Sequence, residues 1–318
     1  MNKPKVFILD PFHPEAIKKL QATPSVELVR RNDDRVSKWR AEADALMIRS
    51  ETRITASDIE QTSKLKCIVK QGVGVDNIDL DAAERRGIAV CNTPAMNSES
   101  VAELTIALAL CVARRVVEFD RRIRGGEAIV RSQVLGLSLF KKTIGIVGMG
   151  NIGSVVARKW IGAMEGDIIA YDPFASAEAW PDIKHRRVSD LNELLKEADV
   201  VTLHVPLTKD TRRLIGKSEF ERMKSEAILL NCARGGVVDE DALLHALEEE
   251  KIHGAALDAM EVEPPTAKAY PKLLKRGNLI ITPHVGANTL ENQIASGMKV
   301  VETVLALLEG REVPNRLV

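Results

Sequence analysis

The chain has 318 residues, and its 45 lysines and arginines balance 45 aspartates and glutamates, so its formal net charge is zero. A chain of this length exceeds the size at which single hydrophobic cores stop growing, so we expect two domains. The balanced charge removes any general electrostatic attraction to nucleic acid or to an acidic membrane surface, and we expect neither partner.

Apolar segments and cysteines indicate the compartment. The longest apolar helical stretch, 104–113, is shorter than the roughly 20 residues needed to span a bilayer, and the apolar run at 6–9 is too short for a signal peptide. The cysteines lie in apolar runs without the spacing of metal ligands; they are Cys67, Cys91, Cys111 and Cys232. We expect a cytoplasmic protein with reduced cysteines and no metal site.

Apolar runs rich in β-branched residues alternate with helical patterns up to residue 91. We expect strands at 5–9, 26–29, 45–49, 66–70 and 88–91, and helices at 14–21, 35–42, 56–62 and 80–86. This alternation is typical of βα units around a parallel sheet, where ligands bind at the carboxyl ends of the strands. After one strand, Gly72 and Gly74 are spaced for an anion-binding nest of backbone N–H groups, with an ordinary glycine turn as the alternative.

A polar segment with a proline, 92–100, predicts a crossing between domains near residue 100. A helical pattern follows at 101–115, with Ser100 and Glu103 spaced as a capping box. The arginine-rich segment 118–138 has no clear periodicity. Because aromatic interleaving is absent, we expect a solvated or subunit-contacting arm rather than a nucleic-acid patch.

The strongest motif of the chain begins at residue 142. An apolar run leads into Gly148, Gly150 and Gly153, spaced as G-x-G-x-x-G, and a helical pattern follows. In this context Gly148 permits a tight turn, Gly150 lets the backbone approach a pyrophosphate, and Gly153 allows the helix to pack closely on the strand. The phosphates would lie over the helix N-terminus, where free N–H groups favour an anion. The motif predicts a dinucleotide site, with a glycine turn that binds nothing as the alternative.

Asp172 identifies the dinucleotide. It follows the next apolar run, 168–171, at the distance of about 20 residues from the glycines that is typical of this motif. A carboxylate at this place accepts hydrogen bonds from the adenosine ribose and repels the additional phosphate of NADP. We therefore predict NAD as the cofactor.

The C-terminal half predicts a second, longer doubly wound unit. We expect strands at 200–205, 227–232, 253–257 and 279–282, and helices at 188–198, 217–223, 240–250 and 290–309. Polar side chains stand after these strands, where a doubly wound sheet binds its ligands. They include one arginine, several carboxylates and two histidines.

These polar groups suit hydride transfer to a 2-oxo acid. Arg234 is suited to hold the substrate carboxylate and polarise its carbonyl, and a protonated His284 is suited to donate a proton to the developing alkoxide. A nearby carboxylate favours the protonated form of a histidine. The spacing does not choose between Glu261 and Glu263 for this partner.

Several ordered motifs resemble the D-isomer-specific 2-hydroxyacid dehydrogenase family, specifically its phosphoglycerate dehydrogenase-like members. The motifs are Gly72-Val73-Gly74-Val75-Asp76-Asn77-Ile78-Asp79, Asn97-Ser98 with Val101-Ala102-Glu103-Leu104, the glycine fingerprint of residues 148–153, His204-Val205-Pro206-Leu207-Thr208 with Thr211, Asn231-Cys232-Ala233-Arg234-Gly235-Gly236, Leu257-Asp258-Ala259-Met260-Glu261-Val262-Glu263-Pro264, and Thr282-Pro283-His284-Val285-Gly286. The resemblance covers nearly the whole chain. It implies an α/β fold of two doubly wound parallel-sheet domains: a Rossmann NAD-binding domain at 100–287 and a discontinuous flavodoxin-like substrate domain at 1–99 plus 288–318.

The resemblance also implies roles for individual residues. Arg234 would bind the substrate, His284 would be the general acid/base, and Glu263 would pair with His284. The implied cofactor-binding residues are Gly148, Gly150, Asn151, Ile152, Gly153, Asp172, His204, Pro206, Thr211, Cys232, Asp258 and Gly286, with Asp258 at the nicotinamide amide. A packing role is the alternative for His204. The implied substrate-binding residues are Arg49, Ser50, Lys70, Val73 and Gly74, the last two through backbone N–H groups.

Three positions depart from the family pattern. Met260 stands where phenylalanine is common, a packing change that we expect to be tolerated. The tryptophan often found shortly after Gly125-Gly126 is missing, which leaves the part of this arm in the site open. Lys70-Gln71 replaces an arginine and a small residue. Arg49, Ser50 and Lys70 are therefore candidates for binding a substrate phosphate or another second anion, with simple solvation as the alternative.

We expect an NAD-dependent enzyme that interconverts a small D-2-hydroxy acid and its 2-oxo acid, with 3-phosphoglycerate and 3-phosphohydroxypyruvate as the favoured pair. The alternatives are a reductase of glyoxylate, hydroxypyruvate or another 2-oxo acid, and an NADH-sensing scaffold similar to the corepressors that resemble these enzymes. The family also implies a homodimer formed by the domain around the fingerprint and its arm.

Overall fold

Residues 3–318 are described by a computed structural model, in which the chain forms two compact units. Unit 1 contains Met1–Asn97 and Ala287–Val318, and unit 2 contains Ser98–Gly286. Unit 1 is therefore discontinuous in sequence, because its last helix follows the whole of unit 2.

Unit 1 is built on a parallel sheet of five strands in the order β2-β1-β3-β4-β5. Its strands are β1 (Lys5–Ile8), β2 (Glu27–Val29), β3 (Ala45–Ile48), β4 (Cys67–Lys70) and β5 (Ala89–Cys91). Its helices are α1 (Pro14–Gln21), α2 (Trp39–Glu42), α3 (Ala56–Glu60), α4 (Leu80–Arg85) and α11 (Leu290–Leu308), with a 3₁₀ turn η1 (Asp34–Lys38). This strand order is the flavodoxin-like one, so the predicted class of unit 1 is confirmed.

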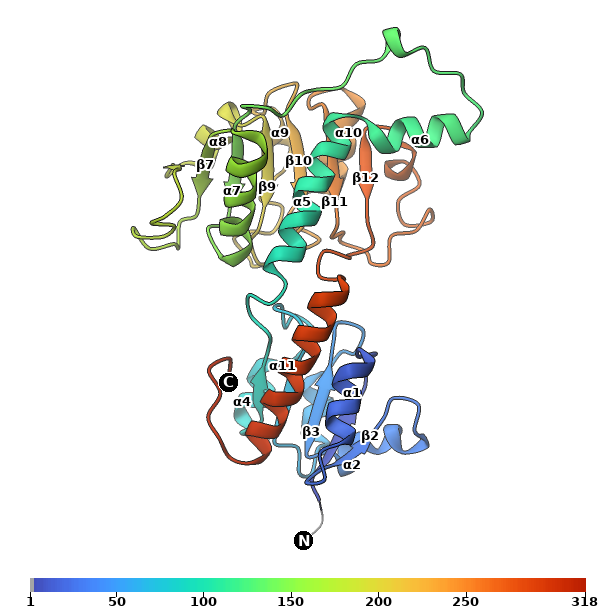
Figure 1. The fold of residues 1–318 in the computed structure, drawn as a ribbon, viewed down its shortest axis with the longest axis vertical. Helices are drawn as coiled ribbons and strands as arrows, with labels where there is room; N and C mark the ends of the chain where they lie inside the picture. Colours follow the sequence, from blue (N-terminus) through green and yellow to red (C-terminus); the bar gives the residue numbers. More distant parts are fainter. Residues whose placement is uncertain (1–2) are drawn as a thin grey trace. The chain divides into compact units, whose positions relative to one another are not determined.

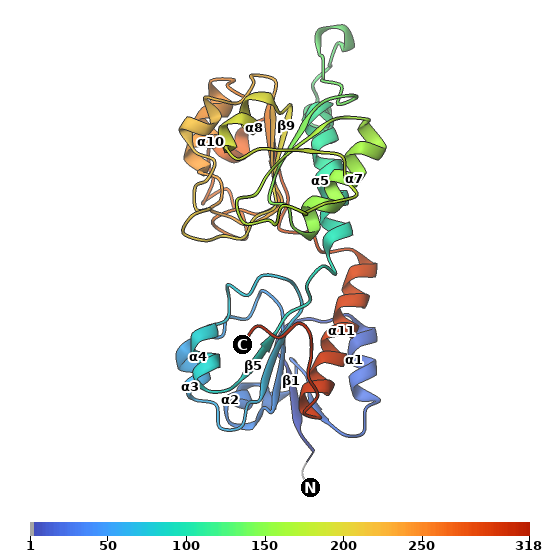
Figure 2. The same cartoon turned by 90° about the vertical axis from the view of Figure 1, so that its left-hand side faces the viewer.

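Two helical layers cover the sheet of unit 1. Helices α1 and α11 lie together on one face, and α3 and α4 lie on the other (Figure 2). Leu20 of α1 and Val300 and Val304 of α11 are buried against Val6 and Met47 of the sheet. Because the strands are covered on both faces, they consist of almost uninterrupted apolar residues.

Unit 2 is built on a parallel sheet of seven strands in the order β12-β11-β10-β9-β6-β7-β8. The strands are β6 (Ile144–Val147), β7 (Ile168–Tyr171), β8 (Arg186–Arg187), β9 (Val200–Leu203), β10 (Ile228–Asn231), β11 (Gly254–Leu257) and β12 (Leu279–Ile281). The helices are α5 (Ser98–Ala113), α6 (Val116–Arg124), α7 (Asn151–Met164), α8 (Leu191–Glu197), α9 (Lys217–Phe220) and α10 (Glu240–Glu248), with 3₁₀ turns η2 (Arg131–Gln133) and η3 (Leu273–Lys275). Six of the strands follow the order of the Rossmann fold, so the predicted class of unit 2 is also confirmed.

The helices of unit 2 again form two layers. Helices α5 and α7 cover one face of the sheet, and α8, α9 and α10 cover the other (Figure 1). Trp160 of α7 is fully buried, and its Nε1 donates to the carbonyl oxygen of Lys142 at 3.0 Å. The order reverses between β6 and β9, the point at which a doubly wound sheet binds its ligand.

Three local expectations were wrong. Helix α5 begins at Ser98, so Ser100 lies inside the helix and is buried there instead of capping it. The predicted arm contains helix α6, none of whose side chains is buried, so no core-facing stripe marked it in the sequence. The predicted helix at 35–42 is split, because η1 precedes the single turn of α2.

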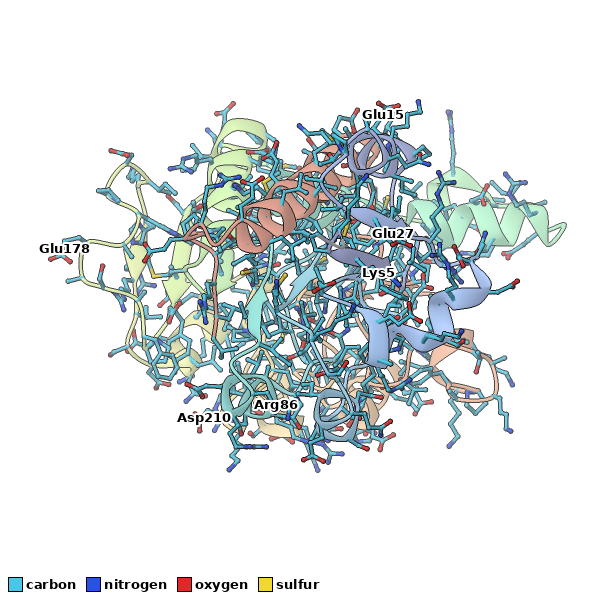
Figure 3. The ribbon with its side chains drawn as sticks, turned by 90° about the horizontal axis from the view of Figure 1, so that it is seen from below. Lys5, Glu15, Glu27, Arg86, Glu178 and Asp210 are labelled. Carbon is cyan, nitrogen blue, oxygen red and sulfur yellow. The ribbon has the colours of Figure 1, made fainter. Side chains whose placement is uncertain are left out.

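Charged side chains lie on the outside of both units. Figure 3 shows Glu15 of α1, together with Glu178 and Asp210 from loops of unit 2, pointing outward. Among residues 3–318, no helix has both the length and the apolar composition required to cross a bilayer.

Candidate active site

The glycine fingerprint forms a close turn between β6 and α7. Gly148 has φ +101°, and a Cβ atom there would lie 2.5 Å from the carbonyl oxygen of His204. At Gly153 a Cβ atom would lie 2.3 Å from the carbonyl oxygen of Gly148, so this helix position packs directly on the turn. Gly150 differs, because no atom lies within 4 Å of the position of its missing Cβ.

This geometry fits a pyrophosphate. Gly150 leaves open space in front of the first turn of α7, where Asn151 and Ile152 follow it. The N–H groups in the first turn of a helix have no partner within the helix, and the helix dipole favours an anion there. Asn151, Ile152 and the glycines are therefore suited to hold the phosphates of a dinucleotide.

The Asp172 carboxylate lies beside the same turn. Its Oδ2 accepts from the backbone N–H of Met149 at 2.8 Å, and its Oδ1 accepts from those of Phe174 at 2.9 Å and Ala175 at 3.1 Å. These bonds fix the carboxylate next to the fingerprint. Each carboxylate oxygen accepts more than one hydrogen bond, so acceptor capacity remains for ribose hydroxyls.

The segment after β9 is held by its own side chains. The Oγ1 of Thr211 donates to the carbonyl oxygen of Pro206 at 2.6 Å. The Nε2 of His204 lies 2.9 Å from Oγ1 of Thr202, while its Nδ1 is buried without a partner. Burial lowers the pKa of His204 far below its usual value, so this imidazole is neutral. A packing role and a neutral contact to the cofactor both fit this arrangement.

The segment after β10 presents Arg234. Asn231 holds it from within, because its Nδ2 donates to the carbonyl oxygen of Arg234 at 2.9 Å. The guanidinium of Arg234 donates from Nη1 to the carbonyl oxygen of Ala233 at 2.8 Å. Cys232 is buried, which raises the pKa of its thiol to about 12, so it contributes a neutral side chain here.

His284 and Glu263 form a direct pair in unit 2. Nδ1 of His284 lies 3.0 Å from both Oε1 and Oε2 of Glu263. Glu261 points elsewhere, since its Oε1 accepts from the Arg212 guanidinium at 3.1 Å. The structure thus distinguishes the two carboxylates that spacing alone could not. With Nδ1 engaged by Glu263, Nε2 is the ring nitrogen through which His284 can exchange a proton with a substrate.

The Glu263 carboxylate is kept ionised by its neighbours. Burial acts to raise its pKa and is the largest single effect, but the hydrogen bond and charge of His284, the N–H of Met260 and the charge of Arg234 together outweigh it. The resulting pKa lies below the usual value. The contribution of Arg234 also indicates that its guanidinium lies near this pair.

Asp258 holds the segment that carries His284. Its Oδ1 accepts from Oγ1 of Thr282 at 2.6 Å and from the N–H of Val285 at 2.8 Å, and its Oδ2 accepts from the N–H of Gly286 at 2.8 Å. The backbone oxygen of Asp258 also accepts from the N–H of His284 at 2.8 Å. Sequence reasoning missed this positioning role, and the predicted contact to nicotinamide stays a prediction.

Unit 1 holds the predicted substrate-binding residues. Lys70 is buried at the end of β4, and its Nζ donates to Oδ1 of Asn77 at 2.6 Å. Asn77 in turn donates to the carbonyl oxygens of Arg49 at 2.8 Å and Thr52 at 2.5 Å. Asn77 therefore links Lys70 to the loop of Arg49, a role that its appearance in a motif did not reveal. Ser50, in the same loop, is exposed.

Three further contacts place the neighbours of Lys70. The Arg49 guanidinium donates to the carbonyl oxygen of Pro11 at 3.2 Å and to Oδ1 of Asn288 at 3.3 Å. Gln71 donates to Oγ of Ser296 in α11 at 2.7 Å. In the turn that follows, Gly72 has φ +125°, and the exposed Val73 precedes Gly74.

Comparison with known proteins gives the family. The model of the D-isomer specific 2-hydroxyacid dehydrogenase, NAD binding domain, matches residues 106–286. D-3-phosphoglycerate dehydrogenase of Methanocaldococcus jannaschii is 44% identical over 98% of this chain and 59% of that protein. Hydroxypyruvate reductase of Thermotoga maritima is 39% identical over 96% of this chain and 98% of that protein. The crystal structure of TT0316 protein from Thermus thermophilus superposes with a TM-score of 0.89 and 38% identity, covering 99% of this chain and 100% of that chain.

The chain belongs to the D-isomer specific 2-hydroxyacid dehydrogenase family, and unit 2 is its NAD-binding domain. The predicted family and the predicted cofactor are thereby confirmed. The chain spans less than two thirds of the length of the phosphoglycerate dehydrogenases that it matches, 59% and 58% for two archaeal examples.

Replacing Asp258 by asparagine should loosen the segment 282–286. The amide keeps the size of the carboxylate but leaves at least one backbone N–H without an acceptor. Hydrogen bonds to charged groups contribute about 1.5–3 kcal/mol, so local opening should become roughly 10-fold or more frequent. Hydrogen exchange at the amides of Val285 and Gly286 measures this. Asp190→Asn, which alters the N-cap of α8, is the matched control, and unchanged exchange in Asp258→Asn would contradict the positioning role.

Proposed function

We propose that this protein is an NAD-dependent oxidoreductase that interconverts a small D-2-hydroxy acid and its 2-oxo acid. The observation that supports this most directly is the pair of His284 and Glu263, 3.0 Å apart and near Arg234, within the NAD-binding domain. A charged donor for a carboxylate and a paired histidine are the groups that reduction of a 2-oxo acid requires.

Each residue has a distinct task in this proposal. NADH, when bound, supplies the hydride. Arg234 holds the substrate carboxylate and polarises the carbonyl, since a guanidinium offers a planar fork of donors that matches a carboxylate. His284 donates a proton from Nε2 to the developing alkoxide, and Glu263 stabilises the protonated imidazole through Nδ1. The fingerprint, Asp172, His204, Pro206, Thr211, Cys232, Asp258 and Gly286 are the proposed cofactor-binding residues.

We favour 3-phosphoglycerate and 3-phosphohydroxypyruvate as the substrate pair. Phosphoglycerate dehydrogenases from two archaea are 44% and 41% identical to this chain over 98% of its length. Lys70 and Arg49, joined through Asn77, supply positive charge for a second anionic group, and the N–H groups of Val73 and Gly74 are proposed for the substrate carboxylate. The Thermotoga maritima relative supports reduction of hydroxypyruvate as the alternative, because its length matches this chain.

A substrate panel tests both parts of this proposal. NADH oxidation should be followed with pyruvate, glyoxylate, hydroxypyruvate and 3-phosphohydroxypyruvate, and the phosphorylated acid should give the highest kcat/KM. Lys70→Met should lower the preference for 3-phosphohydroxypyruvate over hydroxypyruvate by about 10-fold or more, since a hydrogen bond to a charged group is lost. Lys64→Met, at an exposed lysine of the same unit, should leave the preference unchanged. No turnover of any 2-oxo acid would favour a scaffold, and an unaltered preference would exclude Lys70 as an anion ligand.

Glu263→Gln should move the pH profile of the reduction to the acid side. The pKa of Glu263 is lowered, so its carboxylate is charged throughout the pH range in which a histidine titrates. Removing this charge destabilises the protonated imidazole, and His284 then loses its proton at lower pH. Glu261→Gln is the matched control, because that carboxylate binds Arg212 instead. Equal shifts in both variants, or none in Glu263→Gln, would refute the pairing.

We also propose a cytoplasmic homodimer. All four cysteines are free, as expected in a reducing compartment. Apolar side chains are exposed along α6 and the segment after it, namely Val116, Ile123, Val130, Leu135 and Phe140. A run of exposed apolar residues of this kind marks a surface for association.

Leu135→Glu should weaken the proposed dimer. Leu135 is 80% exposed, so a charge there costs little in the monomer but would be buried at an interface. Sedimentation velocity across a dilution series should show the variant dissociating at a higher concentration than the unmodified protein. Leu290→Glu places the same charge at a residue of unit 1 that is 62% exposed and should leave association unchanged. A monomeric unmodified protein would refute the dimer itself.

A further inference from the structure

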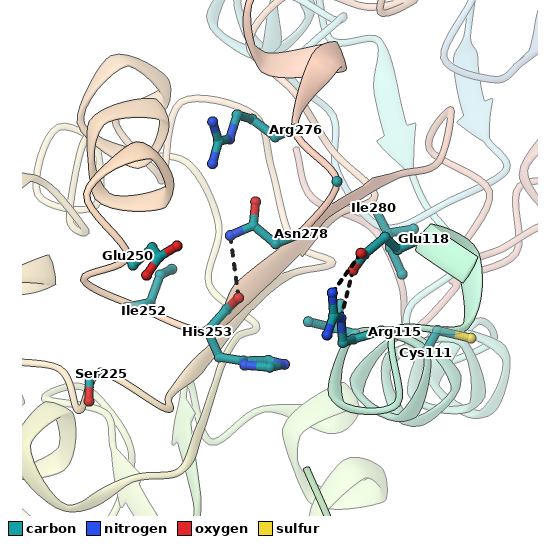
Figure 4. A pocket seen from close by; sticks show the side chains of 12 residues that line it. Cys111, Arg115, Glu118, Ser225, Glu250, Ile252, His253, Arg276, Asn278 and Ile280 are labelled. Carbon is teal, nitrogen blue, oxygen red and sulfur yellow. Dashed lines mark hydrogen bonds and ion pairs between the residues drawn. The ribbon is translucent and has the colours of Figure 1, made fainter. Parts of the chain in front are cut away.

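Unit 2 contains a cavity of about 600 Å³ away from the residues described above (Figure 4). Its lining includes Ser225, His253 and Asn278, which precede β10, β11 and β12. The cavity thus lies at the amino edge of the sheet. The fingerprint, Arg234 and His284 follow the carboxyl ends of strands, at the opposite edge. The volume is within the range of small-molecule sites, about 300–1,000 Å³.

The two arginines of the cavity differ in their partners. Arg115 is neutralised by Glu118, which accepts from its Nη2 at 2.7 Å and from its Nε at 2.8 Å. Arg276 donates from Nη2 to the carbonyl oxygen of Leu247 at 2.9 Å. In the part of the chain that the structure describes, the Arg276 guanidinium has no carboxylate partner, and its buried Nε has no acceptor.

Asn278 supplies the complementary group. Its Nδ2 donates to the carbonyl oxygen of His253 at 3.4 Å, while its Oδ1 is buried without a donor. Figure 4 shows the side chains of Arg276 and Asn278 on the same side of the cavity, with Glu250 on another. The wall therefore offers a charged donor and a neutral acceptor close together in sequence.

The remaining titratable groups leave this pattern intact. Burial, reinforced by the charge of Arg115, lowers the pKa of His253, so its imidazole is neutral near pH 7. Glu250 is exposed and contributes a negative charge to the lining. Cys111 adds a neutral thiol at the edge of α5.

We propose that this cavity binds a small zwitterion of the α-amino acid class. The ligand carboxylate accepts from Nε of Arg276, and the ligand ammonium donates to Oδ1 of Asn278, with Glu250 adding favourable charge. Val112, Ile252 and Ile280 line the same cavity and offer apolar contact to a side chain. A backbone segment of a second copy has a matching N–H and C=O, but it has no charge to neutralise Arg276, so the zwitterion fits better.

Isothermal titration calorimetry on the full chain tests this with three matched probes. L-leucine has both charges, 4-methylpentanoate lacks the ammonium, and 3-methylbutylamine lacks the carboxylate. Leucine should bind, and each of the other two should bind at least about 10-fold more weakly. Equal binding of leucine and either analogue, or no binding of leucine, would overturn the proposal.

Variants assign the binding to the cavity. Arg276→Gln should weaken leucine binding about 10-fold or more, Asn278→Leu should weaken it less, and Asn278→Asp, which keeps the acceptor, should retain it. Arg124→Gln removes an exposed arginine outside the cavity and should have no effect. NADH affinity should be unchanged in all four, which separates this site from the proposed active site. Unaltered leucine binding in both Arg276→Gln and Asn278→Leu would overturn the proposal, as would conversion of a dimer to monomers by Arg276→Gln without leucine binding to the unmodified protein.

Discussion

The carboxylate of Asp258 is 2% exposed and accepts three hydrogen bonds from the segment 282–286. Burying a charge is costly unless hydrogen bonds replace its hydration, and here two backbone N–H groups and a hydroxyl do so. Because the same bonds determine the path of the segment, they also determine where His284 can reach Glu263. The proposed chemistry therefore depends on a residue that need not touch the substrate.

The segments that carry Arg234 and Glu263 are constrained by close backbone approach. A Cβ atom at Gly235 would lie 2.0 Å from the carbonyl oxygen of Met260, so only glycine permits these two loops to meet. The turn of Gly148 against His204 repeats this constraint beside the fingerprint. In both places glycine brings neighbouring strand ends together, and the polar groups that follow them are held by packing rather than by loop flexibility.

The sequence predicted well whatever depends on local pattern. Uninterrupted apolar strands and the spacing of Gly148, Gly150 and Gly153 identified both parallel sheets and the cofactor turn. It could not predict interactions that depend on the path of a loop. Spacing could not choose Glu263 over Glu261, because the two differ only in which of them turns toward His284 and which toward Arg212. Helix α6 escaped for another reason: its stability comes from surface pairs such as Arg115 with Glu118, which leave no apolar stripe.

Unit 1 and unit 2 each place a functional cation with a partner suited to its proposed task. Glu263 is an ionised partner, and it stabilises the positive form of His284 while permitting that charge to come and go with a proton. Asn77 is a neutral partner, and its amide oxygen orients the buried ammonium of Lys70 while its Nδ2 fixes the loop of Arg49. A general acid has to gain and lose its proton, whereas a group that binds a phosphate has to remain positive and in place. A carboxylate serves the first task because it favours the protonated imidazole, and an amide serves the second because it positions the ammonium without adding a charge of its own.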